Sequence, residues 1–166
     1  MVLKFAFLLL LVHSFASLPV TNGCAPTNWS VVWTRVGNTW FTLSRTKGTW
    51  YEMQTLCEKI ENGKTTLARP RTSAEHTHLA RKMASKGTSY AWVGGVRLDG
   101  GNTFYWYKNY RNAVTLRKMT KTFWRRGEPN NVRGHENCVH MHTSYYGWND
   151  VQCTARYSAH CELRCF

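Results

Sequence analysis

The segment from Glu128 to Asp150 reads EPNNVRGHENCVHMHTSYYGWND. It carries three of the nine acidic residues of the chain, whereas the stretch from Gly100 to Gly127 carries none. Its acids and side-chain amides are Glu128, Asn130, Asn131, Glu136, Asn137, Asn149 and Asp150. Carboxylate and amide carbonyl oxygens are the ligands that Ca²⁺ prefers, about six to eight of them at roughly 2.3–2.6 Å. The composition therefore favours a Ca²⁺ site, although Asn, Asp, Gly and Pro also form ordinary solvated turns.

The three carboxylates add a second reason to expect a cation. Negative charges held close together repel one another, and a bound divalent ion turns that repulsion into attraction. The approach to the segment is basic instead, with aromatic residues interleaved. Its cations are Lys108, Arg111, Arg117, Lys118, Lys121, Arg125 and Arg126. We interpret this run as a solvated loop, with contact to anionic glycans or bacterial surfaces as the alternative.

Upstream, the sequence predicts a first helix. Trp50, Met53 and Ile60 recur at helical spacing. Thr49 is a residue type that caps helix N-termini, and the Asn-Gly pair at residues 62–63 is expected to end the helix.

A second helix is predicted after Pro70. The sequence TSAE at Thr72–Glu75 is a capping-box pattern, and this helix is expected to end near Gly87. β-branched and aromatic residues predict strands within 31–43, at 91–95 and at 104–107, and short strands from Cys138 onward. The stretch 108–126 is predicted to be a loop. The fold class is therefore α+β, with two helices, small antiparallel sheets and a long irregular loop region.

The N-terminus has the pattern of a secretory signal peptide at residues 1–16. Lys4 precedes the apolar run FAFLLLLV, which is too short to span a bilayer, and small residues stand at positions 14 and 16. We expect cleavage before Ser17 and a secreted, extracellular protein with no transmembrane segment; the alternative is a buried N-terminal helix. The remaining chain fits one domain, placed at residues 24–166. The sequon at Asn28 predicts an N-glycan.

Composition limits the class of protein further. Six cysteines lie beyond the leader, and an even number in a secreted chain indicates disulfides, whose pairing the count does not choose. The chain has 22 Lys and Arg residues, and losing Lys4 with the leader lowers its formal charge from +13 to +12. Such a charge attracts anionic surfaces but does not define a specific partner.

Three motifs in the opening segment resemble the carbohydrate-binding motifs of the C-type lectin domain family. They are Glu128-Pro129-Asn130, Glu136-Asn137-Cys138 and Trp148-Asn149-Asp150, in the family's order and spacing. The strand Ala91–Gly95 (AWVGG) resembles the core strand of that family. The resemblance covers the chain from about residue 24 to its end.

The resemblance implies a function and a ligand set. Glu128, Asn130, Glu136, Asn149 and Asp150 are implied to hold one Ca²⁺ and to hydrogen-bond two neighbouring sugar hydroxyls. The Glu-Pro-Asn order is the family's pattern for mannose, glucose, N-acetylglucosamine and fucose, and a cis peptide bond is implied before Pro129. This predicts a calcium-dependent lectin that recognises microbial glycans in innate immunity, with no nucleic acid as partner.

The framework cysteines of the family imply two disulfides, Cys57–Cys161 and Cys138–Cys153. The usual partner of Cys24 is absent, so the resemblance favours Cys24–Cys165, while an interchain bridge that makes a homodimer stays open. Relatives often carry acids where this chain has Asn131 and Asn137, which argues against a second calcium site.

The same residues allow other functions. A calcium-independent module that binds anionic polymers or proteins through the basic surface is the main alternative. No Ser/His/Asp elbow, phosphate loop or HExxH motif occurs, so an enzyme is not predicted. His76 with His78 and His140 with His142 have HxH spacing, but a zinc site needs three or four ligands, and we interpret these histidines as polar surface residues. Tyr145 and Tyr146 were predicted to stack on a sugar or to pack the loop.

Overall fold

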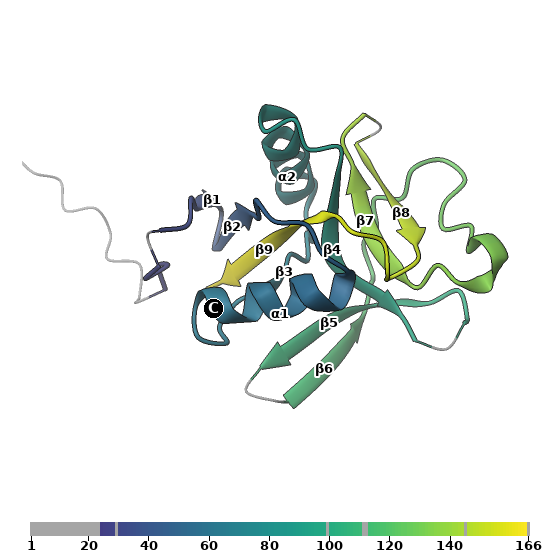
Figure 1. Ribbon diagram of the computed structural model, residues 1–166, viewed down its shortest axis with the longest axis horizontal. Helices are drawn as coiled ribbons and strands as arrows, with labels where there is room; N and C mark the ends of the chain where they lie inside the picture. Colours follow the sequence, from purple (N-terminus) through teal and green to yellow (C-terminus); the bar gives the residue numbers. More distant parts are fainter. Residues whose placement is uncertain (1–23, 29, 99, 111–112, 145, 166) are drawn as a thin grey trace, which may run out of the picture.

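The computed structural model describes residues 24–28, 30–98, 100–110, 113–144 and 146–165. The predicted signal peptide at 1–16 and its cleavage site lie outside the described residues. Two helices and a branched sheet make up the fold (Figure 1). Among the described residues, no helix is both long enough and apolar enough to span a bilayer.

The helices begin where the sequence predicted. Helix α1 is Trp50–Ile60 and helix α2 is Ser73–Ser85. Each has a complete capping box, in which a Thr side chain accepts from the backbone N–H of a Glu three residues later and that Glu accepts in return. These reciprocal bonds satisfy N–H groups that have no partner within the first turn of a helix.

The sheet runs in the order β1-β2-β9-β4-β5-β6, with β3, β7 and β8 branching from it. The strands are β1 Thr34–Val36, β2 Thr39–Leu43, β3 Thr66–Leu67, β4 Tyr90–Arg97, β5 Phe104–Tyr110, β6 Ala113–Lys118, β7 Cys138–His142, β8 Gly147–Val151 and β9 Ser158–Arg164. Strand β4 is the junction: it pairs parallel to β9 and antiparallel to β5 and β7. A Cβ on Gly95 in β4 would lie 2.7 Å from Val139 Cγ2, which explains a glycine at this point of close approach.

The prediction of a loop over 108–126 was wrong in its first half. Strands β5 and β6 form a hairpin, in register from Tyr105 opposite Lys118 to Tyr110 opposite Ala113. All of β6 is exposed, because it is the outer strand and covers no core. Its only apolar alternation is Val114 with Leu116, and two residues are too few to indicate a strand by periodicity.

Three disulfides join segments that are distant in sequence. Cys24 pairs with Cys165, Cys57 with Cys161, and Cys138 with Cys153. No described cysteine is free. Cys24 thus bonds within the chain in this structure, so the structure does not require the interchain alternative.

A buried charge network fixes β9 to the segment before α2. Glu162 is fully buried, and it accepts from Arg69 Nε at 2.9 Å and from the Arg69 backbone N–H at 2.8 Å. Arg164 bridges Glu162 and Glu75 at 3.3 and 3.1 Å. These arginines hold the pKa of Glu162 below its usual range, although burial opposes them.

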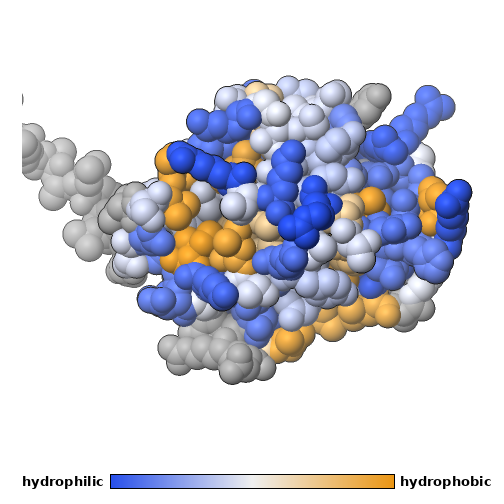
Figure 2. Space-filling model, in the orientation of Figure 1, coloured by the Kyte–Doolittle hydropathy of each residue, from blue (hydrophilic) through white to orange (hydrophobic). Residues whose placement is uncertain are grey.

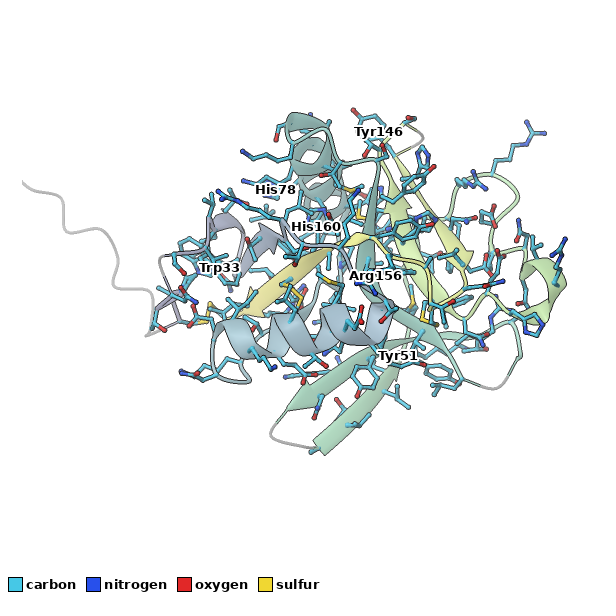
Figure 3. The ribbon with its side chains drawn as sticks, in the orientation of Figure 1. Trp33, Tyr51, His78, Tyr146, Arg156 and His160 are labelled. Atoms are coloured by element: carbon cyan, nitrogen blue, oxygen red, sulfur yellow. A yellow bond between two sulfur atoms is a disulfide. The ribbon has the colours of Figure 1, made fainter. Side chains whose placement is uncertain are left out.

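Two buried histidines should make the folded domain sensitive to acid. Burial lowers the pKa of His160 on β9 (Figure 3) to about 3 and that of His140 to about 4. The unfolded chain takes up protons below a pKa of about 6.5 while the folded chain does not, so stability falls as pH falls through that value. We expect each of these two histidines to lower the free energy of unfolding by on the order of 2 kcal/mol at pH 5 relative to pH 7.

Urea unfolding of His160→Leu at pH 7 and pH 5 checks this. Between pH 7 and pH 5, the free energy of unfolding of the variant is expected to fall by about 2 kcal/mol less than that of the parent protein. His135→Gln, at an exposed position, is the matched control. An unchanged pH dependence in His160→Leu would show that His160 does not contribute.

Candidate carbohydrate and calcium site

Trp148 anchors the 128–150 segment to the core. Its side chain is fully buried and meets Trp106, Phe123 and Trp124 edge-on at centroid distances of 5.5, 5.2 and 5.8 Å. Its backbone N–H donates to Phe123 O at 2.8 Å and its carbonyl accepts from the Arg125 N–H at 3.0 Å. These contacts tie β8 to the chain just before Glu128, so Asn149 and Asp150 follow a rigid position.

Asp150 connects β8 to the turn that carries Asn130. Its side chain is completely buried. Oδ1 accepts from the Asn130 backbone N–H at 3.0 Å, and Oδ2 accepts from that of Asn131 at 3.0 Å. A single carboxylate therefore orients two backbone amides that are distant from it in sequence. The Glu128–Pro129 peptide bond within this turn is cis, as the resemblance implied.

The two carboxylate oxygens of Glu128 differ in their hydrogen bonding. Oε1 accepts from Arg125 Nε at 3.0 Å, Arg125 Nη2 at 2.7 Å and Asn130 Nδ2 at 3.1 Å. Oε2 is buried and has no hydrogen-bond partner among the described residues.

Glu136 lies near the other two acids. Its Oε2 accepts from the Val132 N–H at 2.8 Å, and its own N–H donates to Asn131 Oδ1 at 3.2 Å. Burial raises the pKa of Glu136; the Val132 N–H lowers it, and the charges of Asp150 and Glu128 raise it further. The three carboxylates of the segment are therefore near enough for the charges of Asp150 and Glu128 to act on Glu136.

The donor set fits a hard cation in its chemistry. Glu128 Oε2 and Asn149 Oδ1 are buried oxygens without a hydrogen-bond partner within the described chain. Such atoms cost free energy unless a partner is supplied, and a cation supplies one. The His, Cys, Asp and Glu side chains in the described ranges do not already form a three-membered group in metal-holding geometry. Carboxylates from Glu128 and Asp150 instead pair with arginines.

Arg97, at the end of β4, is the site residue that sequence reasoning missed. Its Nη2 donates to Asp150 Oδ2 at 2.5 Å, and the side chains of the pair are 1% and 0% exposed. The guanidinium lies 4.6 Å from the Phe104 ring centroid. Its Nε and Nη1 have no hydrogen-bond partner in the described part of the chain. An arginine in an otherwise apolar strand was the signal, because a buried arginine almost always has a partner.

The histidine pairs do not converge on a metal, and two of the four are not surface residues as interpreted. His76 and His140 are buried. His76 stacks on Phe123 at 4.3 Å and its Nε2 lies 2.6 Å from Tyr146 O. His140 packs against both Tyr90 and Tyr157, at centroid distances of 5.3 and 5.1 Å, and these two tyrosines also contact each other at 5.1 Å.

The structure also places some of the aromatic and basic residues that were singled out around the site. Tyr146 lies exposed at the turn between β7 and β8 (Figure 3), and Tyr145 lies outside the described residues. Within the basic run, Arg125 contacts a predicted ligand, whereas Lys121 lies over the Phe123 ring at 5.7 Å.

Comparison with known proteins accounts for this arrangement. The family model described as Lectin C-type domain matches residues 46–163. This chain belongs to the C-type lectin domain family. Among curated relatives, CD209 antigen-like protein 2 of Macaca mulatta is 28% identical over 132 residues, covering 80% of this chain and 46% of the relative. The chain therefore spans less than half the length of that protein.

Two further relatives are close to this chain in length. Lectoxin-Enh3 of Pseudoferania polylepis is 31% identical over 121 residues, covering 70% of this chain and 71% of that protein. The crystal structure of the C-type lectin CEL-I from Cucumaria echinata superposes with a TM-score of 0.67 at 19% identity, covering 83% and 96% of the two chains. The C-type lectin fold and the three disulfides agree with the predicted fold class.

Proposed function

We propose that this protein is a secreted, calcium-dependent lectin for mannose-type glycans. The observation that carries the proposal is that the charges of Glu128 and Asp150 act on Glu136, while Glu128 Oε2 and Asn149 Oδ1 are buried without a hydrogen-bond partner among the described residues. The ligands would be Glu128, Asn130, Glu136, Asn149 and Asp150, and Ca²⁺ would supply a positive centre that binds two sugar hydroxyl oxygens. Catalysis is not part of the proposal.

The side chains themselves can read the sugar. A carboxylate accepts from a hydroxyl, and an amide NH₂ donates to one, so an acid–amide pair distinguishes the two ends of a vicinal diol. Glu128 and Asn130 already meet at 3.1 Å, which sets the spacing of one such pair. Recognition through two hydroxyls is weak for one site, so useful binding needs several sites, and a homodimer is one way to provide them.

Affinity chromatography tests the proposal. Mannose resin equilibrated with Ca²⁺ is expected to retain the protein, and EDTA or free mannose is expected to elute it. The Glu136→Gln variant removes one ligand charge and is expected to bind less well, whereas Glu58→Gln, on α1 outside the site, serves as the matched control. Retention that EDTA does not change would contradict the calcium-dependent mechanism.

A second candidate follows from the arginines. Arg125 and Arg97 already neutralise Glu128 and Asp150, which is consistent with a calcium-independent module that binds anionic polymers. Heparin binding that is weakened by salt but not by EDTA, together with no retention on mannose, would favour this function.

The sequon at Asn28 remains a proposed glycosylation site. Asn28 Nδ2 donates to Ile60 O at 3.3 Å, and Oδ1 accepts from the Ser30 N–H at 3.2 Å. An N-linked glycan replaces only one amide hydrogen, so the bond to Ile60 is compatible with it.

A further inference from the structure

A groove of about 820 Å³ lies between α1, the end of α2 and the loop that follows β2. In Figure 1 these elements lie to the left, and the loop before β7 lies to the right, along the longest axis of the molecule. Figure 2 shows an apolar patch in this region, bordered by hydrophilic side chains. The groove is therefore separate from the proposed sugar site and has the volume of a small-molecule pocket.

The floor of the groove is apolar. Leu43 of β2 and Leu56 and Ile60 of α1 line it and are only partly buried by the core. Val32 also lines it and is 61% exposed. Contiguous exposed apolar surface of this kind marks an interaction site, because burying it is favourable at about 25 cal/mol per Å².

The rim of the groove is cationic. Four basic residues line it, and none of its lining residues is acidic. They are Arg45, Lys47, Lys82 and Lys86. Within the described ranges, no carboxylate forms an ion pair with any of the four. Lys82 lies in the last turn of α2 and Lys86 is the C-cap residue of this helix, and both line the groove. The groove thus joins an apolar surface to unbalanced positive charge.

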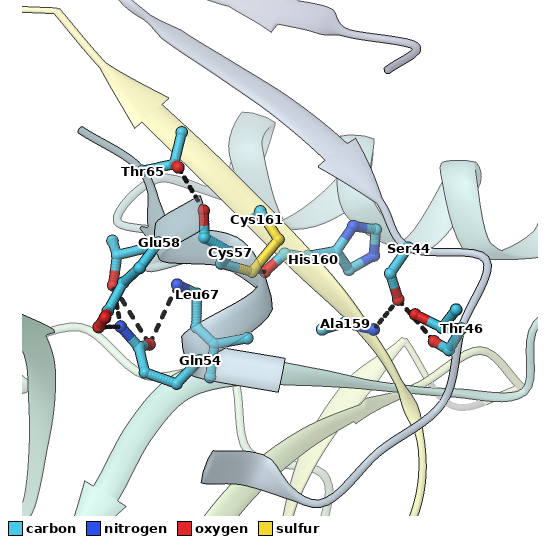
Figure 4. The surroundings of a disulfide bond; sticks show 11 residues. Ser44, Thr46, Gln54, Cys57, Glu58, Thr65, Leu67, Ala159, His160 and Cys161 are labelled. Carbon is cyan, nitrogen blue, oxygen red and sulfur yellow. Dashed lines mark hydrogen bonds between the residues drawn. A yellow bond between two sulfur atoms is a disulfide. The ribbon is translucent and has the colours of Figure 1, made fainter. Parts of the chain in front are cut away.

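Hydrogen bonds within the chain hold the cationic loop, residues 44–48, against β9 and the segment before it. Ser44 Oγ accepts from the Ala159 N–H at 2.9 Å and donates to Thr46 O at 2.8 Å (Figure 4). Gly48 and Tyr157 exchange two backbone bonds, each of 3.0 Å. The Cys57–Cys161 disulfide joins α1 to β9 (Figure 4). A site that is already ordered binds with a smaller entropy cost.

We propose that this groove binds an anionic amphiphile, a molecule with one long alkyl chain and a carboxylate or phosphate head group. The alkyl chain covers the floor formed by Leu43, Leu56 and Ile60, and the head group lies against the rim formed by the four cations. This chemistry is independent of the sugar site, so either proposal can fail without the other.

Calorimetric titration with laurate and with dodecyl phosphate, each below its micellar concentration, tests the proposal. One-to-one binding of either anion is expected, and the stronger of the two identifies the head group. Dodecyltrimethylammonium has a similar chain and the opposite charge, and butyrate has the charge without the chain; neither is expected to bind. Equal binding of the cationic amphiphile, or no binding of either long-chain anion, would overturn the proposal.

Charge reversal on the rim locates the site. Lys82→Glu/Lys86→Glu is expected to weaken binding about tenfold or more, and raising salt from about 50 to about 500 mM is expected to weaken binding to the parent protein. Arg45→Glu/Lys47→Glu, at two exposed loop positions, is a second independent pair. Lys118→Glu/Lys121→Glu makes the same change outside the groove and is the matched control.

Equal loss in the control and rim variants would show non-specific charge attraction and overturn the assignment. Sizing chromatography tests the alternative that a second copy of the chain occupies the groove. A dimer that Val32→Asp dissociates and laurate does not affect would assign the groove to self-association and overturn the proposal.

Discussion

Replacing Arg97 with methionine is expected to destabilise the domain in EDTA by about 3–5 kcal/mol. The substitution keeps an unbranched side chain beside Phe104 but removes the charge that pairs with Asp150 at 2.5 Å. Asp150 is completely buried, so its carboxylate would lose its cationic partner while remaining out of water. Breaking a buried pair from one side costs much more than the pair itself contributes, because the remaining charge is uncompensated.

Urea unfolding in EDTA and in excess Ca²⁺ measures this effect. Calcium is expected to recover part of the lost stability, because a cation again lies beside Asp150 and binds only the folded chain. Arg156→Met is the matched control: Arg156 pairs with Glu52 at 2.9 Å, but their side chains are 61% and 55% exposed. A pair this exposed to solvent is expected to contribute little to stability. Similar losses in both variants would show that the Arg97 pair has no special role.

The second large effect is expected for the double variant Glu128→Gln/Asn130→Asp. It exchanges the acid and the amide while conserving charge, and in the C-type lectin family Gln-Pro-Asp is the pattern for galactose. We expect retention to move from mannose resin to galactose resin, with a preference changed by at least about tenfold, or ~1.4 kcal/mol. The physical reason is that the donor and acceptor positions facing the diol are reversed.

Competition on both resins with free mannose and free galactose gives the measurement. Asn131→Asp adds an acid one residue further along, outside the proposed ligand set, and is expected to leave the preference for mannose unchanged. Its carboxylate can still accept from the Glu136 N–H, as Asn131 Oδ1 does at 3.2 Å. If the double variant still prefers mannose, Glu128 and Asn130 do not determine the sugar specificity.

Local sequence patterns predicted the elements that have strong local causes. Helix α1 was predicted from the helical spacing of Trp50, Met53 and Ile60, and helix α2 from the capping-box pattern of Thr72 with Glu75; both signals involve residues only a few positions apart. Strand β6 was missed for the opposite reason. Its six residues are all exposed, and pairing with β5 is what makes it a strand. A backbone partner supplied by another segment leaves no periodicity in the strand itself.

The candidate site was likewise predicted only in part. Residue type in the 128–150 segment pointed to a Ca²⁺ site, and the resemblance of its three motifs to the C-type lectin domain family implied the five ligands. They did not predict that Asp150 holds the backbone of Asn130 and Asn131, or that Arg125 contacts Glu128. These contacts depend on the direction of each side chain, which the folded backbone sets.

The sequence by itself therefore determined the class of the domain, its two helices and the acids and amides of the candidate site. Only the tertiary structure decided that Arg97 lies against Asp150, 53 residues away, and that four cations surround an apolar groove. The physical reason is the range of the interactions. Capping and side-chain periodicity act within a few residues, whereas a buried ion pair or a groove exists only after β4, β8, α1 and α2 have packed.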